Sequence, residues 1–153
     1  MATMLDLRLE LIVPELAATT KAEVLAEFAS LVTAGFPELE CEVVVRTLQE
    51  REKLGSTGIG DGIAIPHGKL KGLERLILAF GRSRTGVDFN SLDGRKVHLF
   101  FLLLAPEDAS GLHLKALARI SRLMKDPAVR TGLMAAADAA AIHVLLREQD
   151  RRF

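Results

Sequence analysis

Residues 55–70, GSTGIGDGIAIPHGKL, are the most informative part of this sequence. A glycine-rich turn leads into a short apolar strand, residues 63–65, which is followed by Pro66, His67 and Gly68. Pro66 fixes its own φ and favours extended geometry in the residue before it, and Gly68 allows the backbone to turn sharply and to be approached closely. The pattern predicts a histidine at the carboxyl end of a strand, where open α/β sheets place ligand sites. The alternative is a turn histidine whose ring is bonded to the backbone and has no chemical role.

The apolar pattern on both sides of this stretch predicts strands and helices around a buried sheet. Strands are expected at residues 9–13, 63–65, 75–82 and 97–105, and helices at residues 20–35, 41–54, 110–126, from Pro127 onward and at 138–147. Thr20 followed by Glu23 has the spacing of a capping box. The last two strands are apolar nearly throughout, as strands covered on both faces are. Helices before and after such a sheet predict a three-layer α/β/α fold.

Composition narrows the class of protein. The 153 residues are enough for a single domain with its own core, residues 1–153. Twenty basic and twenty acidic side chains leave no net charge, so electrostatics favours neither nucleic acid nor an anionic membrane as a partner. The one cysteine, Cys41, fits a reducing cytosol. Residues 1–10 carry charges where a signal peptide is apolar, and the longest apolar run, residues 99–105, is too short for a membrane span. We therefore expect a cytoplasmic domain.

Four further residues are predicted to lie near His67. His113 is on the core-facing stripe of its helix but in the first turn, where the helix dipole favours a neutral imidazole. Arg51 leans toward the buried stripe of its own helix, either as a snorkelling side chain or as a charge directed into a site. Ser56 and Thr57, with the amides of the glycine-rich turn, offer donors to an anion. Together these groups suit a phosphoryl group with about two negative charges.

Other chemistries fit the sequence less well. Zinc needs three or four ligands, and although the two histidines and Asp61 are candidates, no compact ligand spacing is present. There is no GxSxG elbow, and Cys41 lies in an expected helix. The glycines match neither GxGxxG nor a Walker motif. His98, inside a buried strand, and His143, on the last helix, are interpreted as satisfied structural histidines. We expect no metal and no cofactor.

At these residues the sequence resembles the enzyme IIA domains of the fructose/mannitol class of the bacterial phosphoenolpyruvate phosphotransferase system. The resemblance extends from about residue 5 to residue 147. The active-site pattern of that family is satisfied by Glu52, Ile59, Gly60, Ile63, Ala64, Ile65, Pro66, His67 and Gly68. The family fold that the resemblance implies is a mixed central sheet between helical layers.

The resemblance also implies a role for each candidate residue. His67 would accept the phosphoryl group from the phosphohistidine of HPr, on its tele nitrogen. Arg51, sixteen positions earlier, would be the supporting arginine, and His113 the second histidine. Ser56 and Thr57 match the polar pair that binds phosphate.

Within the class, residues 55–70 look most like the nitrogen-regulatory branch, enzyme IIA-Ntr. Such proteins take phosphate from HPr or its nitrogen-branch paralogue and act on target proteins, for example a potassium transporter or a sensor kinase. This implies no nucleic-acid partner and no insertion into a membrane. Two alternatives stay open: a sugar-specific IIA that passes phosphate to a IIB component, and a binding module without catalysis.

Overall fold

One mixed β-sheet organises the molecule. The computed structural model describes residues 7–152, so the first six residues and Phe153 of the expected single domain lie outside the described part. The strands are β1 (Ile12–Val13), β2 (Gly58–Gly60), β3 (Ile63–Ala64), β4 (His67–Leu70), β5 (Ile77–Val87) and β6 (Val97–Pro106). Their order is β1-β5-β6-β3-β2, and β4 also pairs with β6. Because β5 and β6 are antiparallel while β3 and β4 are parallel to β6, the predicted mixed sheet is confirmed.

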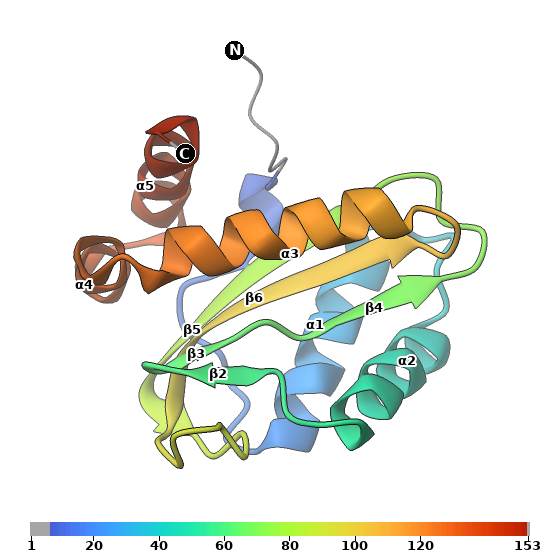
Figure 1. Cartoon of the computed structure of the whole chain (residues 1–153), viewed down its shortest axis with the longest axis horizontal. Helices are drawn as coiled ribbons and strands as arrows, with labels where there is room; N and C mark the ends of the chain where they lie inside the picture. The colour runs from blue at the N-terminus through green and yellow to red at the C-terminus, as the bar shows by residue number, and fades with distance from the viewer. Residues whose placement is uncertain (1–6, 153) are drawn as a thin grey trace.

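Helices cover both faces of the sheet, as Figure 1 shows. They are α1 (Lys21–Gly35), α2 (Cys41–Lys53), α3 (Ser110–Lys125), α4 (Pro127–Ala135) and α5 (Ala139–Arg152). In that view α3 crosses in front of the sheet, whereas α1 lies behind it and α2 lies beside α1, below β4. The predicted three-layer α/β/α arrangement is therefore confirmed. Between residues 7 and 152, every helix is too short or too polar to cross a membrane.

Local signals set several helix ends where the sequence predicts them. The Thr20 hydroxyl accepts from the Glu23 amide at 3.2 Å, and the Glu23 carboxylate accepts from the Thr20 amide at 3.1 Å, so the capping box that starts α1 is confirmed. Asp126 caps α4 by accepting from the Ala128 amide at 2.9 Å. A side-chain acceptor satisfies helix amides that otherwise have no partner within the helix.

Two strand predictions were partly wrong. Residues 9–13 form a 3-10 turn, η1 (Leu9–Leu11), and only two strand residues, because the Leu11 amide donates back to the Arg8 carbonyl at 3.0 Å. The expected strand 75–82 instead runs as β5 from Ile77 to Val87, with a register shift against β6 after Arg82. The guanidinium of Arg82 is buried and bonded to carbonyls, so the strand continues past this residue.

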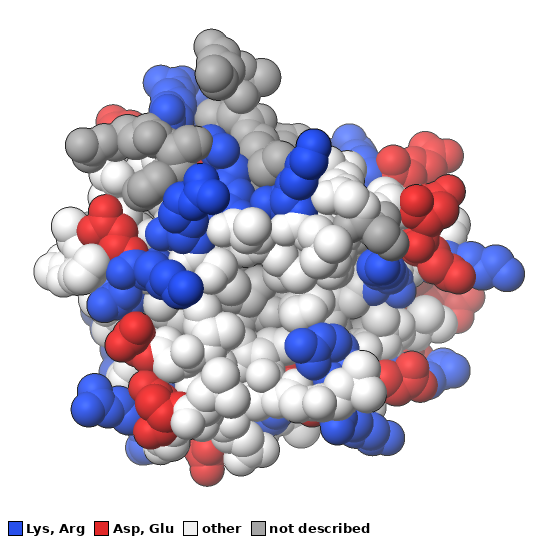
Figure 2. Space-filling model, in the orientation of Figure 1, with Lys and Arg blue, Asp and Glu red and all other residues white. Residues whose placement is uncertain are grey.

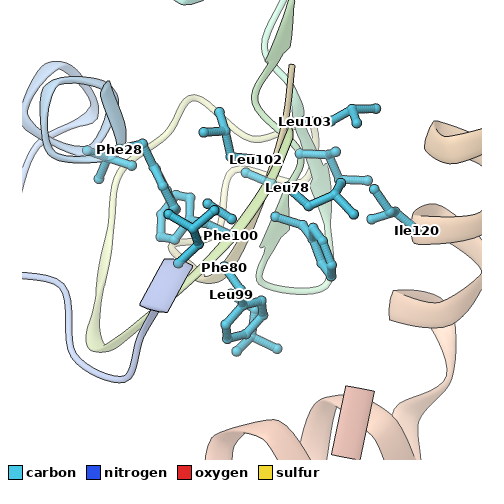
Figure 3. Close-up of a cluster of buried hydrophobic side chains, with 14 of the residues drawn as sticks. Phe28, Leu78, Phe80, Leu99, Phe100, Leu102, Leu103 and Ile120 are labelled. Atoms are coloured by element: carbon cyan, nitrogen blue, oxygen red, sulfur yellow. The ribbon is translucent and has the colours of Figure 1, made fainter. Parts of the chain in front are cut away.

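The central strand β6 carries the core on both of its faces. Phe100 packs against Phe28 of α1 and against Phe89, with ring centroids 6.4 and 5.4 Å apart, respectively. Phe101, the next residue, packs edge-on against Phe80 of β5 at 5.8 Å. Figure 3 shows Phe28 on one side of the sheet and Ile120 of α3 on the other. Successive strand residues point to opposite faces, which explains why β6 is apolar nearly throughout.

Candidate functional site

His67 lies at a break in a strand beside β6. Ile63 and Ala64 of β3 pair in parallel with Leu99 and Phe100, and after Pro66 the pairing resumes, with His67 opposite Leu103. Pro66 has no N–H to donate, although its carbonyl still accepts from the Leu103 amide at 3.0 Å. The sequence predicted His67 at the carboxyl end of a strand. His67 does follow β3, but it is also the first residue of β4 and therefore lies within the sheet.

The sequence predicted that the chain turns sharply at Gly68 and that its backbone is closely approached. Only the close approach is observed. Gly68 lies inside β4, with no left-handed backbone angle. A Cβ built at this position would come within 2.7 Å of Cγ2 of Thr47 in α2. A small residue is therefore needed here because α2 packs directly on the backbone of β4. This packing brings the carboxyl end of α2 to the imidazole.

The hydrogen bonds of the His67 ring define its tautomer. Nδ1 lies 2.7 Å from the carbonyl oxygen of Ile65, and Nε2 lies 3.1 Å from Nε of Arg51. Because a carbonyl only accepts and a guanidinium only donates, Nδ1 carries the proton and Nε2 presents a lone pair. Burial lowers the pKa of His67 from its ordinary 6.5; the Ile65 carbonyl opposes this shift and the charge of Arg51 adds to it. The ring is accordingly neutral at pH 7.

Arg51 is directed into the site. Besides the bond to His67, its Nη1 donates to the carbonyl of Gly55 at 2.9 Å. These two bonds hold the guanidinium between the end of α2 and β4. The alternative interpretation of Arg51, a snorkelling side chain with its charge in water, does not describe this geometry.

His113 approaches from the opposite layer. It lies in the first turn of α3, and its ring centroid is 5.3 Å from that of His67 at an interplanar angle of 57°. The side chain is buried, with a residue exposure of 6%, and Nδ1 has no hydrogen-bond partner among the described residues. Burial, then the nearby His67 and Lys69, lowers the pKa of His113 below 6.5. A buried nitrogen without a partner destabilises a protein by about 1–3 kcal/mol, so a polar ligand that bonds to Nδ1 would be favoured at this site.

Ser56 and Thr57 both make internal bonds in the glycine-rich turn. The Ser56 hydroxyl donates to the Phe89 carbonyl at 2.6 Å and accepts from the Gly58 amide at 3.0 Å. The Thr57 hydroxyl donates to the Glu52 carboxylate, and its amide donates to the same carboxylate at 3.0 Å. Their role in binding phosphate stays a prediction. The observed bonds fix the shape of the turn.

The remaining histidines lie away from His67. His98 is half-buried, which differs from the predicted core position, although its Nδ1 is satisfied by the Ser83 carbonyl at 2.9 Å. It lines a pocket of about 530 Å³ together with Asp61 and Arg130, at the opposite end of β6 from the partner of His67. His143 bonds through Nε2 to the Leu7 carbonyl at 2.9 Å. Within residues 7–152, no three His, Cys, Asp or Glu side chains gather into a potential metal-binding group.

Sequence reasoning missed three features near the site. The strand β4 was not expected, nor was the hairpin that joins β2 and β3 through Asp61 and Gly62, both at positive φ. An Asp-Gly pair is a known signal for such a two-residue turn. The third feature is Lys21, which forms an ion pair with Glu52 at 2.9 Å. No local pattern connects two residues so far apart in the sequence.

Comparisons with known proteins cover almost all of the described chain. The family model for the phosphoenolpyruvate-dependent sugar phosphotransferase system, EIIA 2, matches residues 7–149. A nitrogen regulatory protein of Bradyrhizobium diazoefficiens is 46% identical over 137 residues, which are 90% of this chain and 89% of that protein. The fructose-specific EIIABC component of Bacillus subtilis is 45% identical over 101 residues, 66% of this chain and 16% of that component. The crystal structure of nitrogen regulatory protein IIA-Ntr from Neisseria meningitidis has a TM-score of 0.86 at 36% identity, covering 92% of this chain and 95% of that one.

Proposed function

Because the chain belongs to the EIIA 2 family of the phosphoenolpyruvate-dependent sugar phosphotransferase system, we propose that it carries a phosphoryl group on Nε2 of His67. It is an IIA-Ntr-like phosphotransfer component. The proposed donor is the phosphohistidine of HPr or of its nitrogen-branch paralogue. The proposed output is regulation of target proteins, which bind differently to the phosphorylated and unmodified forms.

The observation that carries this proposal is that Nε2 of His67 is unprotonated and presents its lone pair toward Arg51. With its proton on Nδ1, held by the Ile65 carbonyl at 2.7 Å, the ring can attack phosphorus without first losing a proton. A new N–P bond forms on Nε2 as the N–P bond of the donor breaks, and that electron pair returns to the donor imidazole. The Nδ1 proton stays in place throughout. Catalysis of this step rests on positioning and on charge stabilisation.

Arg51 and His113 are placed to stabilise the transferred group. Arg51 contacts Nε2 directly, so its bond to the lone pair must open before attack, after which the guanidinium faces the new phosphoryl oxygens. Two charge-assisted bonds from a guanidinium match a phosphoryl group well. His113, 5.3 Å from His67 between ring centroids, is buried with an unpartnered Nδ1. A bound phosphoryl oxygen would give a donor on this ring the partner that it lacks.

Exposed apolar side chains near these residues provide a surface for protein partners. Leu112 and Leu114, on either side of His113 in α3, are 43% and 65% exposed, and Leu54, at the end of α2, is 84% exposed. Figure 2 shows that the middle of the face containing α3 is largely free of charged side chains, which gather toward its margin. Interfaces of this kind have apolar centres and polar rims. Since the phosphoryl donor and the target protein must both contact His67, we propose that they compete for this surface.

A second candidate function is supported by the match to the Bacillus subtilis fructose-specific component. In that case the phosphate would pass to a sugar-specific IIB instead of controlling a target such as a potassium transporter or sensor kinase. Under either candidate the proposed unit is a single cytoplasmic EIIA domain. The single cysteine, Cys41, which is free in the structure, fits a reducing compartment.

Reconstitution tests the proposal and separates the two candidates. The protein is incubated with phosphoenolpyruvate, Enzyme I and HPr, then offered a fructose-type IIB or used to capture partners from cytosol in its unmodified, phosphorylated and His67→Ala forms. Capture of a partner by one form only, competed by HPr, supports regulation. Efficient transfer to the IIB, with no partner that distinguishes the forms, supports the sugar-specific role. Failure of the protein to gain phosphate contradicts both.

A further inference from the structure

We propose that Lys21 is a positioning residue for phosphoryl transfer, acting on the His67 site through its partly buried ion pair with Glu52. The inference rests on the proposed function, because it concerns how that site tolerates a phosphoryl group. It adds a residue that lies outside the stretch 55–70 and on a different helix from Arg51 and His113. Lys21 is the first residue of α1, whereas Glu52 follows Arg51 near the end of α2.

The Glu52 carboxylate is the centre of a closed network. Oε1 accepts from Nζ of Lys21 at 2.9 Å and from the amide of Thr57 at 3.0 Å, and Oε2 accepts from the Thr57 hydroxyl. The Glu52 side chain is only 6% exposed and that of Lys21 21%. The three donors provide hydrogen-bond partners for both oxygens of this carboxylate. The network therefore keeps one negative charge beneath the turn that adjoins the site.

Lys21 also packs on the segment that supports the turn. Its Nζ lies 4.7 Å from the ring centroid of Phe89, and the carbonyl of Phe89 accepts the Ser56 hydroxyl at 2.6 Å. An ammonium over an aromatic face is attracted to it. The start of α1, the end of α2 and the loop after β5 are thereby joined around residues 56 and 57.

Charge explains why this network matters for transfer. The charged and titratable groups that act on the two site histidines are Arg51 and Glu52 from α2, at His67, and Lys69 from β4, at His113. The charge of Glu52 raises the pKa of His67, opposing Arg51. A phosphoryl group on His67 adds about two negative charges to this set. Without Lys21 the buried Glu52 would repel that group, whereas the ion pair compensates the charge of Glu52 and leaves that of Arg51 available.

A double-mutant cycle tests the inference: Lys21→Met, Glu52→Gln and the combined variant, with Lys125→Met as a control. The control removes the same charge from an exposed side chain at the far end of α3. One readout is an NMR pH titration of the His67 ring, which needs no phosphotransfer. The other is the equilibrium distribution of phosphate between HPr and the protein.

We expect Lys21→Met to raise the pKa of His67 and to shift the equilibrium toward phospho-HPr by roughly three- to tenfold, which is in the lower part of the range of coupling within one ion-pair network. Glu52→Gln should lower that pKa, and the combined variant should return both readouts toward wild type. Unchanged readouts in Lys21→Met, a shift matched by Lys125→Met, or no reversal in the combined variant would overturn the inference. If Lys21→Met does not fold, an unchanged His67 pKa in Glu52→Gln overturns it instead. Failure of the proposed function looks different, because then wild-type protein gains no phosphate on His67.

Discussion

Nε of Arg51 donates to Nε2 of His67 at 3.1 Å, so the unprotonated nitrogen of the ring is also the atom that the guanidinium contacts. The two residues are sixteen positions apart, and α2 brings them together by packing on Gly68. The contact orients the ring in the unmodified protein. It also places a positive charge where phosphoryl oxygens arrive.

Replacing Arg51 or His113 should slow phosphoryl transfer but leave His67 as the acceptor. Arg51→Ala and His113→Ala each remove a donor to the transferring group, and losing one such donor typically slows a reaction by about 10²–10³. Quench-flow rates of transfer from phospho-HPr measure the effect. His98→Ala, at the other end of β6, should transfer at the wild-type rate. Wild-type rates in both site variants, or a selective defect in His98→Ala, would contradict the assignment.

The two site histidines should titrate below pH 6.5. Burial is the first cause of the lowered pKa in both rings; the charge of Arg51 lowers the pKa of His67 further, and the nearby His67 ring lowers that of His113. In the unfolded chain both return to about 6.5, so the unfolded state binds more protons as the pH falls through that value. The free energy of unfolding should therefore decline below pH 6.5, and His113→Leu should remove part of the decline. NMR titration and urea unfolding at several pH values check this; a ring that titrates above 6.5 would refute it.

Gly68→Ala should destabilise the protein through one identified contact. The new Cβ would meet Cγ2 of Thr47 at 2.7 Å, and the Thr47 hydroxyl is bonded to the Val43 carbonyl at 2.8 Å within α2. Overpacking of this kind costs about 1–3 kcal/mol. Thr47→Ser removes the methyl group but keeps the hydroxyl, so the double variant should recover most of the loss. Denaturant unfolding of the four proteins measures it, and an absence of recovery would show that the clash lies elsewhere.

Arg82 should matter for stability and not for transfer. Its guanidinium is buried, with a residue exposure of 2%, and donates to the carbonyls of Pro14, Leu133 and Ala136 at 2.7–2.8 Å. Arg82→Met leaves these acceptors without a donor, which should cost at least about 2 kcal/mol. Thermal and urea unfolding should show this loss while the folded variant transfers phosphate normally. A stable Arg82→Met protein would contradict the structural role.

Local signals in the sequence were enough to predict the three layers of the fold and the grouping of His67, Arg51 and His113. The Thr20–Glu23 capping box and the apolar run that forms β6 each act over a few residues. The positions of Arg51 and His113 on the inward stripes of their helices predicted that both approach His67, and the family resemblance implied their roles. What could not be predicted depends on contacts between distant segments. The continuation of β5 past Arg82 requires carbonyls from α4 and from the β1–α1 connection. The pairing of Lys21 with Glu52, and the internal bonds of Ser56 and Thr57, appear only when α1, α2 and the glycine-rich turn are placed together.

The most direct test of the account locates the phosphate on the protein. After incubation with phosphoenolpyruvate, Enzyme I and HPr, the wild-type protein should carry one acid-labile, base-stable phosphate, and His67→Ala should carry none while keeping its fold. Nitrogen-15 and phosphorus-31 NMR of the phosphorylated protein should place the N–P bond on Nε2 of His67, with the Nδ1 proton still present. A phosphate on Nδ1 of His67, on His113 or on any other side chain would contradict the account.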